Sequence, residues 1–258
     1  MTLTEYTGPC DIRVANTVID AKIVRCNLGI LAMNVHIKNS LILGSIDSAS
    51  GNVAHSLLLE DSEVDGGTDQ IVTVANQYFT LRRANIHGGE GSVGCAFECD
   101  IQDSWLHDQY LPPGGDWHLD GFISNGGRPD GTDSNVLLRH NTIVCEDQNA
   151  SPGYGCSGNV GLFPDFAPLV GFTIDRNLFV STWGTSRGGG SYCLYAGAGP
   201  DAKPFASQTS HIVITNNTFQ RGVQHKCAQY GPTANYDSAR VGNVWSGNLW
   251  DDGTSLTP

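Results

Sequence analysis

A short pattern of apolar and polar positions recurs along most of the chain. Each copy has alternating apolar residues, two polar residues, a small residue or Asn, and a second apolar pair. Alternation over a few residues is typical of a half-buried strand, and a polar break at a fixed offset predicts a turn between two short strands. The eight copies are VHIKNSLI from Val35, LLLEDSEV from Leu57, FTLRRANI from Phe79, CDIQDSWL from Cys99, VLLRHNTI from Val136, FTIDRNLF from Phe172, IVITNNTF from Ile212 and NVWSGNLW from Asn243.

The position after the two polar residues is small or Asn in every copy. Asn tolerates the left-handed backbone region and bonds to nearby backbone groups, so it suits a turn. Stacked copies would let the Asn side chains bond to one another as a ladder. The positions are Ser40, Ser62, Ala84, Ser104, Asn141, Asn177, Asn217 and Asn248, at spacings of 22, 22, 20, 37, 36, 40 and 31 residues.

A further strand is predicted before each strand pair, and these strands would form a first sheet. The long spacings come from Gly- and Pro-rich inserts just before several of these strands, and such composition indicates loops. Consecutive inserts on one edge of a sheet would wall a groove, and loops on a rigid scaffold commonly carry function. The candidate strands are 70–76, 91–97, 116–124, 157–163, 191–197 and 227–231.

The turns xNNTF, xRNLF, xHNTI and xGNLW resemble those of the right-handed parallel β-helix, the pectate-lyase-like superfamily, over about residues 15 to 250. The resemblance implies coils of three strands, an asparagine ladder and a carbohydrate-active protein. We therefore expect an all-β, single-domain right-handed parallel β-helix over residues 1–258, with long loops walling a groove along one sheet. The N-terminal cap would span about 1–16, the coils about 17–250 and the tail 251–258.

Composition and charge narrow the class of protein. Only 16% of the 258 residues are charged and 32 are Gly, a balance that favours an all-β chain. No apolar run approaches the ~20 residues of a membrane helix, so we expect no membrane partner. Lys and Arg number 14 against 26 Asp and Glu, a net charge of −12. Nucleic acid is therefore an unsuitable partner, because binding it requires a cationic face.

The eight cysteines are even in number and lack zinc-site spacing, which favours disulfides and an oxidising, extracellular location. Eight cysteines allow 105 connectivities. Sequential pairing closes short loops and fits the repeat geometry, so we predict Cys10–Cys26, Cys95–Cys99, Cys145–Cys156 and Cys193–Cys227.

The candidate site is the stretch HDQYLPPGGDWHLDGFIS, residues 107–124, where the first long insert meets a first-sheet strand. Side chains alternate across a strand. Alternation predicts a core-facing set, Trp117, Leu119, Gly121 and Ile123, and a groove-facing set, His118, Asp120 and Phe122.

Three chemistries fit this stretch. In an acid–base site, His118 or His107 is the base, Tyr110 the acid, and Asp120 orients the ring. In a cation site, the oxygen ligands of Asp108, Asp116 and Asp120 suit Ca²⁺. In a glycosidase, two of the aspartates form the catalytic pair. Predicted substrate-binding residues are Asp108, Asn159, Arg128, Arg139, His140, Arg187 and Tyr195, and the loop aromatics Tyr154, Phe166 and Trp183 are candidates for stacking on sugars.

The sequence HLDGF is similar to the NTDG element of polygalacturonases, with His118 in place of Asn. The other elements of that family, and the catalytic arginine of pectate lyases, have no counterpart. We predict a secreted, monomeric polysaccharide lyase that cleaves a uronate-containing glycan by β-elimination. The alternatives are a glycoside hydrolase using paired aspartates in the same groove, and a non-catalytic glycan-binding adhesin or phage tail module.

Overall fold

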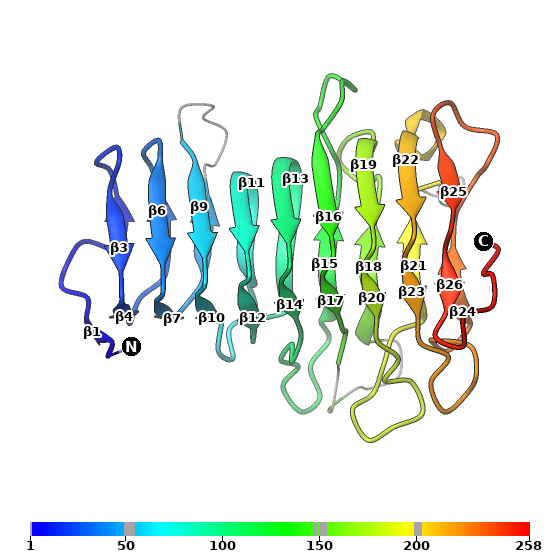
Figure 1. The fold of residues 1–258 in the computed structure, drawn as a ribbon, viewed down its shortest axis with the longest axis horizontal. Helices are drawn as coiled ribbons and strands as arrows, with labels where there is room; N and C mark the ends of the chain where they lie inside the picture. Colours follow the sequence, from blue (N-terminus) through cyan, green and yellow to red (C-terminus); the bar gives the residue numbers. More distant parts are fainter. Residues whose placement is uncertain (1, 49–54, 147–148, 150–153, 199–202) are drawn as a thin grey trace.

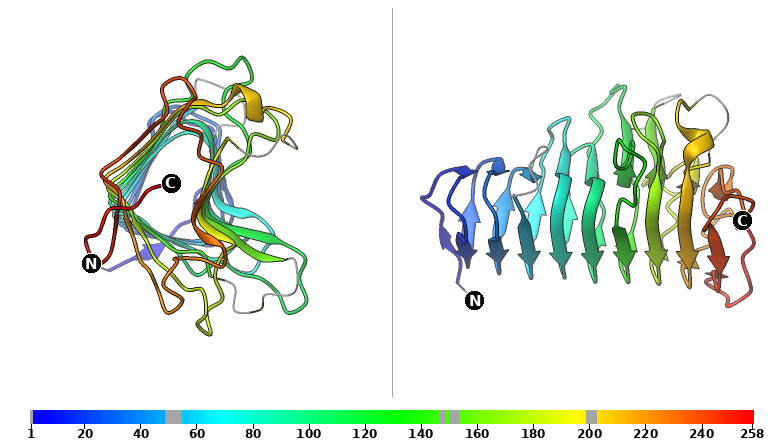
Figure 2. Two further views of the ribbon diagram at one scale, coloured as in Figure 1. Left: turned by 90° about the vertical axis from the view of Figure 1, so that its right-hand side faces the viewer. Right: turned by 90° about the horizontal axis from the view of Figure 1, so that it is seen from above.

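A computed structural model of the chain describes residues 2–48, 55–146, 149, 154–198 and 203–258. In this part of the chain the protein is all-β, with one 3-10 turn, η1 (Ala206–Gln208). The paired strands are parallel and come from successive repeats, so the chain winds from sheet to sheet and advances along the long axis (Figures 1 and 2).

Two sheets contain the strands. The ten-stranded sheet has the order β1 (Thr4–Glu5), β4 (Lys22–Val24), β7 (Leu41–Leu43), β10 (Glu63–Asp65), β12 (Asn85–His87), β14 (Trp105–Leu106), β17 (Thr142–Ile143), β20 (Leu178–Phe179), β23 (Thr218–Phe219) and β26 (Leu249–Trp250). The sixteen-stranded sheet consists of two rows that share the long strands β11 and β13.

The first row of the larger sheet is β2 (Asp11–Ile12), β5 (Leu28–Ile30), β8 (Ile46–Ser48), β11 (Val72–Arg82), β13 (Gly91–Gln102), β15 (His118–Ser124), β18 (Gly155–Leu162), β21 (Tyr192–Ala196) and β24 (Gly231–Ala234). The second row adds β3 (Val18–Asp20), β6 (Val35–Lys38), β9 (Leu57–Glu60), β16 (Val136–Arg139), β19 (Val170–Asp175), β22 (Ser210–Thr215) and β25 (Val244–Ser246). The first row contains the predicted first-sheet strands with one exception. Residues 227–230 precede β24 rather than forming it.

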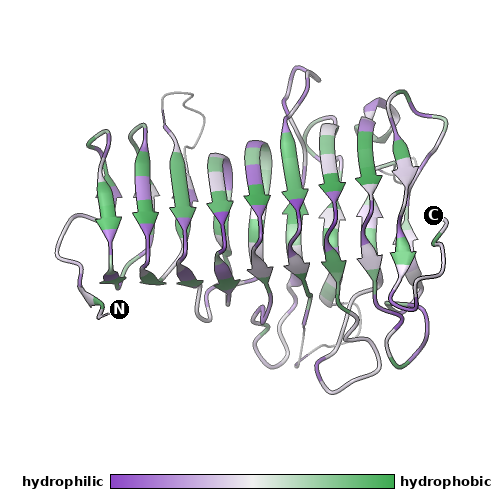
Figure 3. Ribbon diagram, in the orientation of Figure 1, coloured by the Kyte–Doolittle hydropathy of each residue, from purple (hydrophilic) through white to green (hydrophobic). Residues whose placement is uncertain are grey.

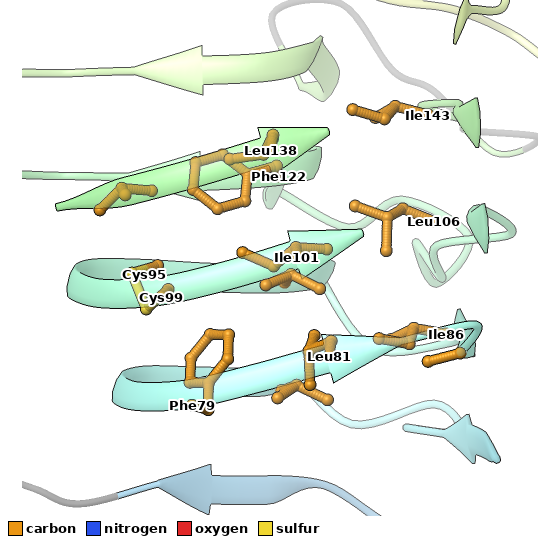
Figure 4. Packing of buried hydrophobic residues seen from close by; sticks show 14 of the residues in the cluster. Phe79, Leu81, Ile86, Cys95, Cys99, Ile101, Leu106, Phe122, Leu138 and Ile143 are labelled. Carbon is orange, nitrogen blue, oxygen red and sulfur yellow. A yellow bond between two sulfur atoms is a disulfide. The ribbon is translucent and has the colours of Figure 1, made fainter. Parts of the chain in front are cut away.

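The core lies between the two sheets. Buried apolar side chains recur at equivalent positions of successive repeats, as Leu81, Ile101 and Leu138 illustrate (Figure 4). The rings of Phe179 and Phe219 stack with centroids 4.3 Å apart. Apolar residues concentrate in the strands and polar residues in the turns and loops (Figure 3). The alternation in the sequence therefore reflects burial of one face of each strand.

The predicted ladder runs along the inner side of the turns. The amide nitrogen of Asn141 donates to Oδ1 of Asn177 at 3.0 Å, Asn177 to Asn217 at 3.1 Å and Asn217 to Asn248 at 2.9 Å. The predicted reason for Asn was wrong, because the residue before each ladder position adopts the left-handed conformation, as in His140 (φ 55°). Asn is used because its buried amide bonds to the adjacent coils, where an unpaired polar group would be costly.

Four disulfides join Cys10–Cys26, Cys95–Cys99, Cys145–Cys156 and Cys193–Cys227, which are the predicted pairs. Disulfides persist in oxidising compartments, so they indicate an extracellular environment. The described residues contain no helix of the length and apolarity needed to cross a membrane.

Candidate functional site

A cleft of about 950 Å³ lies on the outer side of the first row. Asp120 and Ile123 of β15, Ser157 of β18 and Tyr195 of β21 line its floor. Its walls come from the segments that precede and follow these strands. The loops after β14, β20 and β23 project from the same edge of the molecule (Figure 1). Those after β14 and β20 are two of the predicted inserts, and the third, EDQNASPGYG, falls largely outside the described residues.

The register of β15 differs from strict alternation. Phe122 was predicted to face the groove and Ile123 the core, but Phe122 is fully buried in the core and Ile123 lines the cleft. Gly121 faces inward as predicted, because a Cβ there would lie 2.7 Å from Cγ2 of Ile143. Gly121 and Phe122 are therefore two consecutive inward residues. Leu119 is buried in a separate small cluster against which Trp117 packs.

The adjacent strands β13 and β18 also have two consecutive inward-facing residues at this position. The break in alternation is therefore a feature of successive coils and is not confined to β15. Phe122 pairs with Val93 and Val160, and each of these residues follows a second buried residue. Those preceding residues bond to carbonyls of the opposite turn. Asn159, for example, donates to the carbonyls of Ile143 and Val180 at 2.8 Å each. Asn159 therefore faces inward, so the prediction that it contacts substrate in the groove was wrong.

Asp120 is the most unusual group of the cleft. It is only 2% exposed, and neither carboxylate oxygen completes a hydrogen bond, although the Gly158 amide lies close enough to favour the anion. Burial raises the pKa of Asp120 well above its ordinary value. Gly161 is required beside it, because a Cβ there would lie 2.7 Å from Oδ1 of Asp120. The environment of the carboxyl group therefore favours its protonated form.

Glu90 is a second carboxyl group of the cleft that sequence reasoning did not select. It immediately precedes β13, whose Gly91 pairs with Asp120, so the two acids belong to adjacent strands. Burial raises the pKa of Glu90, and its charge in turn raises the pKa of Asp120. The sequence signal that could have identified Glu90 was its place in NIHGGEG, just before a first-sheet strand. The histidine of this segment, His87, contacts Glu63 and Asp65 outside the cleft lining.

Aromatic side chains surround these acids. The predicted stacking residues Tyr154 and Trp183 line the cleft, whereas Phe166 does not. His118 is exposed on the cleft wall, with its ring 5.7 Å from that of Tyr154. Its predicted hydrogen bond to Asp120 is absent from the described residues, since both Asp120 oxygens lack a partner. The aromatic lining is Trp117, Tyr154, Phe163, Trp183, Tyr195 and Tyr230.

Three other predicted catalytic or metal-binding residues lie outside the lining of the cleft. His107 is buried beneath Trp105, with its nitrogens 2.7 Å from Asp108 and 2.6 Å from Asn85. The ring of Tyr110 packs edge-on against that of Trp117, with the ring centroids 6.3 Å apart. Asp108 bonds to His107 and Arg187, so it is separated from Asp116 and Asp120 of the cleft. The predicted Ca²⁺ ligands therefore do not converge, and no cluster of three potential metal ligands occurs among the described residues.

The predicted cationic substrate ligands are engaged elsewhere. Ion pairs join Arg128 to Glu98 at 2.5 Å, Arg139 to Asp175 at 3.2 Å, His140 to Asp103 at 2.6 Å, and Arg187 to both Asp108 and Glu146. None of these four basic side chains lines the cleft formed by the described residues. Lys203 does line it, but Asp165 pairs with it at 2.7 Å.

Arg187 forms ion pairs with Asp108 and Glu146 and so links three inserts. The pKa values of both acids are strongly shifted. Burial raises the pKa of Glu146 to about 7, and Asp108 adds to the rise. The hydrogen bond with Glu146 lowers the pKa of Asp108 to about 2, with additional lowering by His107 and Arg187. Arg187 belongs to the loop that carries Trp183, so this cluster supports one wall of the cleft.

Glu146→Gln should change how stability depends on pH. The folded pKa of Glu146 exceeds its ordinary value, so its stabilising contribution is complete below pH ~4.5 and is lost as pH rises through about 7. We expect the Tm difference, variant minus wild type, to increase from pH 5 to pH 8, as measured by thermal melting. Asp252→Asn is the control, because the pKa of Asp252 is about 2 and its difference curve should stay flat there. Parallel curves for Glu146→Gln and wild type would contradict the assignment.

Comparisons of the chain with protein-family models, curated proteins and solved structures gave no significant match.

Proposed function

We propose that this chain is a secreted right-handed parallel β-helix of the pectate-lyase-like type that hydrolyses a glycan in its cleft. The parallel coils and the four disulfides support the architecture and the extracellular setting. A large open cleft lined by aromatic rings and a few polar groups suits a chain of sugar rings. The polysaccharide is the only partner that the proposal requires, and the enzyme acts as a monomer.

The observation that carries the hydrolytic reaction is the burial of Asp120 in the cleft floor. Burial raises the pKa of this carboxyl group well above its ordinary value, which favours the protonated form that a general acid needs. Such a proton is what the leaving oxygen of a glycosidic bond needs. In this proposal Asp120 donates the proton during bond cleavage.

Glu90 is the proposed partner of Asp120. Hydrolysis needs a second carboxylate that is ionised while the acid is protonated. Burial raises the pKa of Glu90, but Asp120 is wholly buried and its pKa is raised much further, so Glu90 ionises first. The two environments thereby separate the roles, with Glu90 as the base or nucleophile.

Lyase chemistry is the second candidate, and the observation that favours it is the exposed His118 beside Tyr154 in the cleft. These residues would act as base and acid in a β-elimination. A uronate also needs its carboxylate neutralised, yet Arg128, Arg139 and Arg187 are ion-paired outside the cleft lining. Hydrolysis therefore fits the cleft better.

A panel of neutral, amino-sugar and uronate polysaccharides distinguishes these functions. We expect new reducing ends without the ultraviolet absorbance of unsaturated sugars. Reducing ends accompanied by that absorbance would indicate a lyase. Retained binding without either product would indicate an adhesin or phage tail module, and both results would overturn hydrolysis.

A further inference from the structure

The carboxyl groups of the cleft lack cationic partners. Glu90, Asp116 and Asp120 line it without an ion pair to any described basic side chain, whereas Asp165 is paired with Lys203. Asp116 is exposed at the rim, and Asp120 is 98% buried with both oxygens unpartnered in the floor. The basic side chains in the lining are His118 and the paired Lys203. The cleft therefore presents carboxyl groups, of which Asp116 is the exposed one, without a Lys or Arg free to compensate them.

The Lys and Arg side chains of the molecule are either paired already or lie outside the cleft lining. Of the 14 Lys and Arg residues, all of which are described, 12 form ion pairs with carboxylates. The other two, Lys22 and Lys226, lie outside the cleft lining. An anionic sugar entering the cleft would meet carboxylates without a compensating cation, and like charges at an interface disfavour binding.

A sugar that carries a positive charge would instead be attracted by these carboxylates. Ammonium groups bind between carboxylates and aromatic faces, because both the charge and the ring quadrupole attract a cation. Asp116 lies beside Trp117 in sequence, and Tyr154, Trp183 and Tyr230 share the same lining. Asp116 precedes the acid Asp120 by four residues in an extended segment, so an ammonium there need not contact the group that donates the catalytic proton.

We propose that the cleft binds a glycan whose sugars carry unacetylated amino groups, with the Asp116 carboxylate contacting an ammonium. This substrate class rests on the proposed glycan-binding function of the cleft. It predicts affinity for glucosamine-type oligomers over their N-acetylated and neutral counterparts.

Binding is measured by calorimetry on the Asp120→Asn protein, so that cleavage of the oligomers is slow during the titration. The probes are β-1,4-linked oligomers of glucosamine, N-acetylglucosamine and glucose of equal length, at mildly acidic pH where the amines are protonated. We expect the glucosamine oligomer to bind about tenfold more tightly, from two or so exposed ion pairs. Added salt should erode this preference. A further Asp116→Asn change should weaken glucosamine binding about fivefold and leave the other oligomers unaffected.

The matched control is Asp130→Asn in the same background, since Asp130 is exposed outside the cleft lining and should not affect binding. Equal affinity for the three oligomers, no glucosamine binding, or indifference to Asp116→Asn would each overturn the substrate class. Cleavage of a neutral glycan by the wild type in those cases would leave the hydrolase proposal standing. Tight, salt-sensitive glucosamine binding without cleavage of any glycan by the wild type would support the substrate class while overturning hydrolysis.

Discussion

Asp120→Asn should lower the hydrolytic rate by about 10²- to 10⁴-fold, the usual contribution of a general acid. Asn nearly preserves the shape of the side chain but has no carboxylic proton to donate. The buried position and the raised pKa of Asp120 make this the largest expected effect on activity in the cleft. The measurement is kcat on the glycan that the product assay identifies, with circular dichroism to verify the fold.

Stability provides the accompanying check on Asp120. Its folded pKa is raised, so its contribution to stability is complete below its ordinary pKa of about 3.8 and is lost as pH rises. The Tm of Asp120→Asn relative to wild type should therefore increase with pH. Asp165→Asn is the activity control, because its charge is already paired with Lys203 and its loss should cost less than about tenfold. Wild-type turnover by Asp120→Asn would remove Asp120 from the mechanism.

The pH profile separates the role of Glu90 from that of Asp120. Ionised Glu90 and protonated Asp120 together predict a bell-shaped rate profile, with Glu90 setting the acidic limb and Asp120 the alkaline limb. The residual activity of Glu90→Gln should lose the acidic limb, because Gln does not titrate. A merely structural Glu90 would lower the rate and leave the limbs in place.

The repeat architecture was predictable because each coil repeats the same physical requirements. The turn residues from Ser40 to Asn248 occupy one ladder, so their spacing reported the stacking of the coils directly. The sequential disulfides followed for the same reason, since each bridges segments that the coil already brings together. The recurring local pattern therefore gave both the strands and the order in which they pair.

The composition of the site was less predictable. Asp116, His118, Asp120 and Tyr195 do line the cleft, as their place on first-row strands and their preceding loops implied. The irregular inserts have no period, and nothing in the sequence showed that Arg187 would reach Asp108, 79 positions away. Glu90 was missed because its role depends on the adjacent strand that carries Asp120, which is a pairing between coils.

Phe122→Ala should destabilise the fold by about 3–5 kcal/mol, the usual cost of removing a buried Phe from a packed core. Phe122 is fully buried between Val93 and Val160, whereas its neighbour Ile123 is half-buried at the cleft floor. Strict alternation from the sequence assigned the opposite faces, because it did not anticipate the doubled inward pair at Gly121 and Phe122.

Ile123→Ala is the matched variant for this comparison. It should cost about 1 kcal/mol or less, since its neighbours are the glycines Gly94 and Gly161 and its outer side is open to the cleft. Urea unfolding midpoints of the two variants measure the difference, and glycan binding should weaken for Ile123→Ala. A larger loss of stability in Ile123→Ala than in Phe122→Ala would restore the alternating register. That result would place Phe122 in the cleft floor beside Asp120 and move Ile123 into the core, so the stability comparison tests the floor geometry on which the catalytic proposal depends.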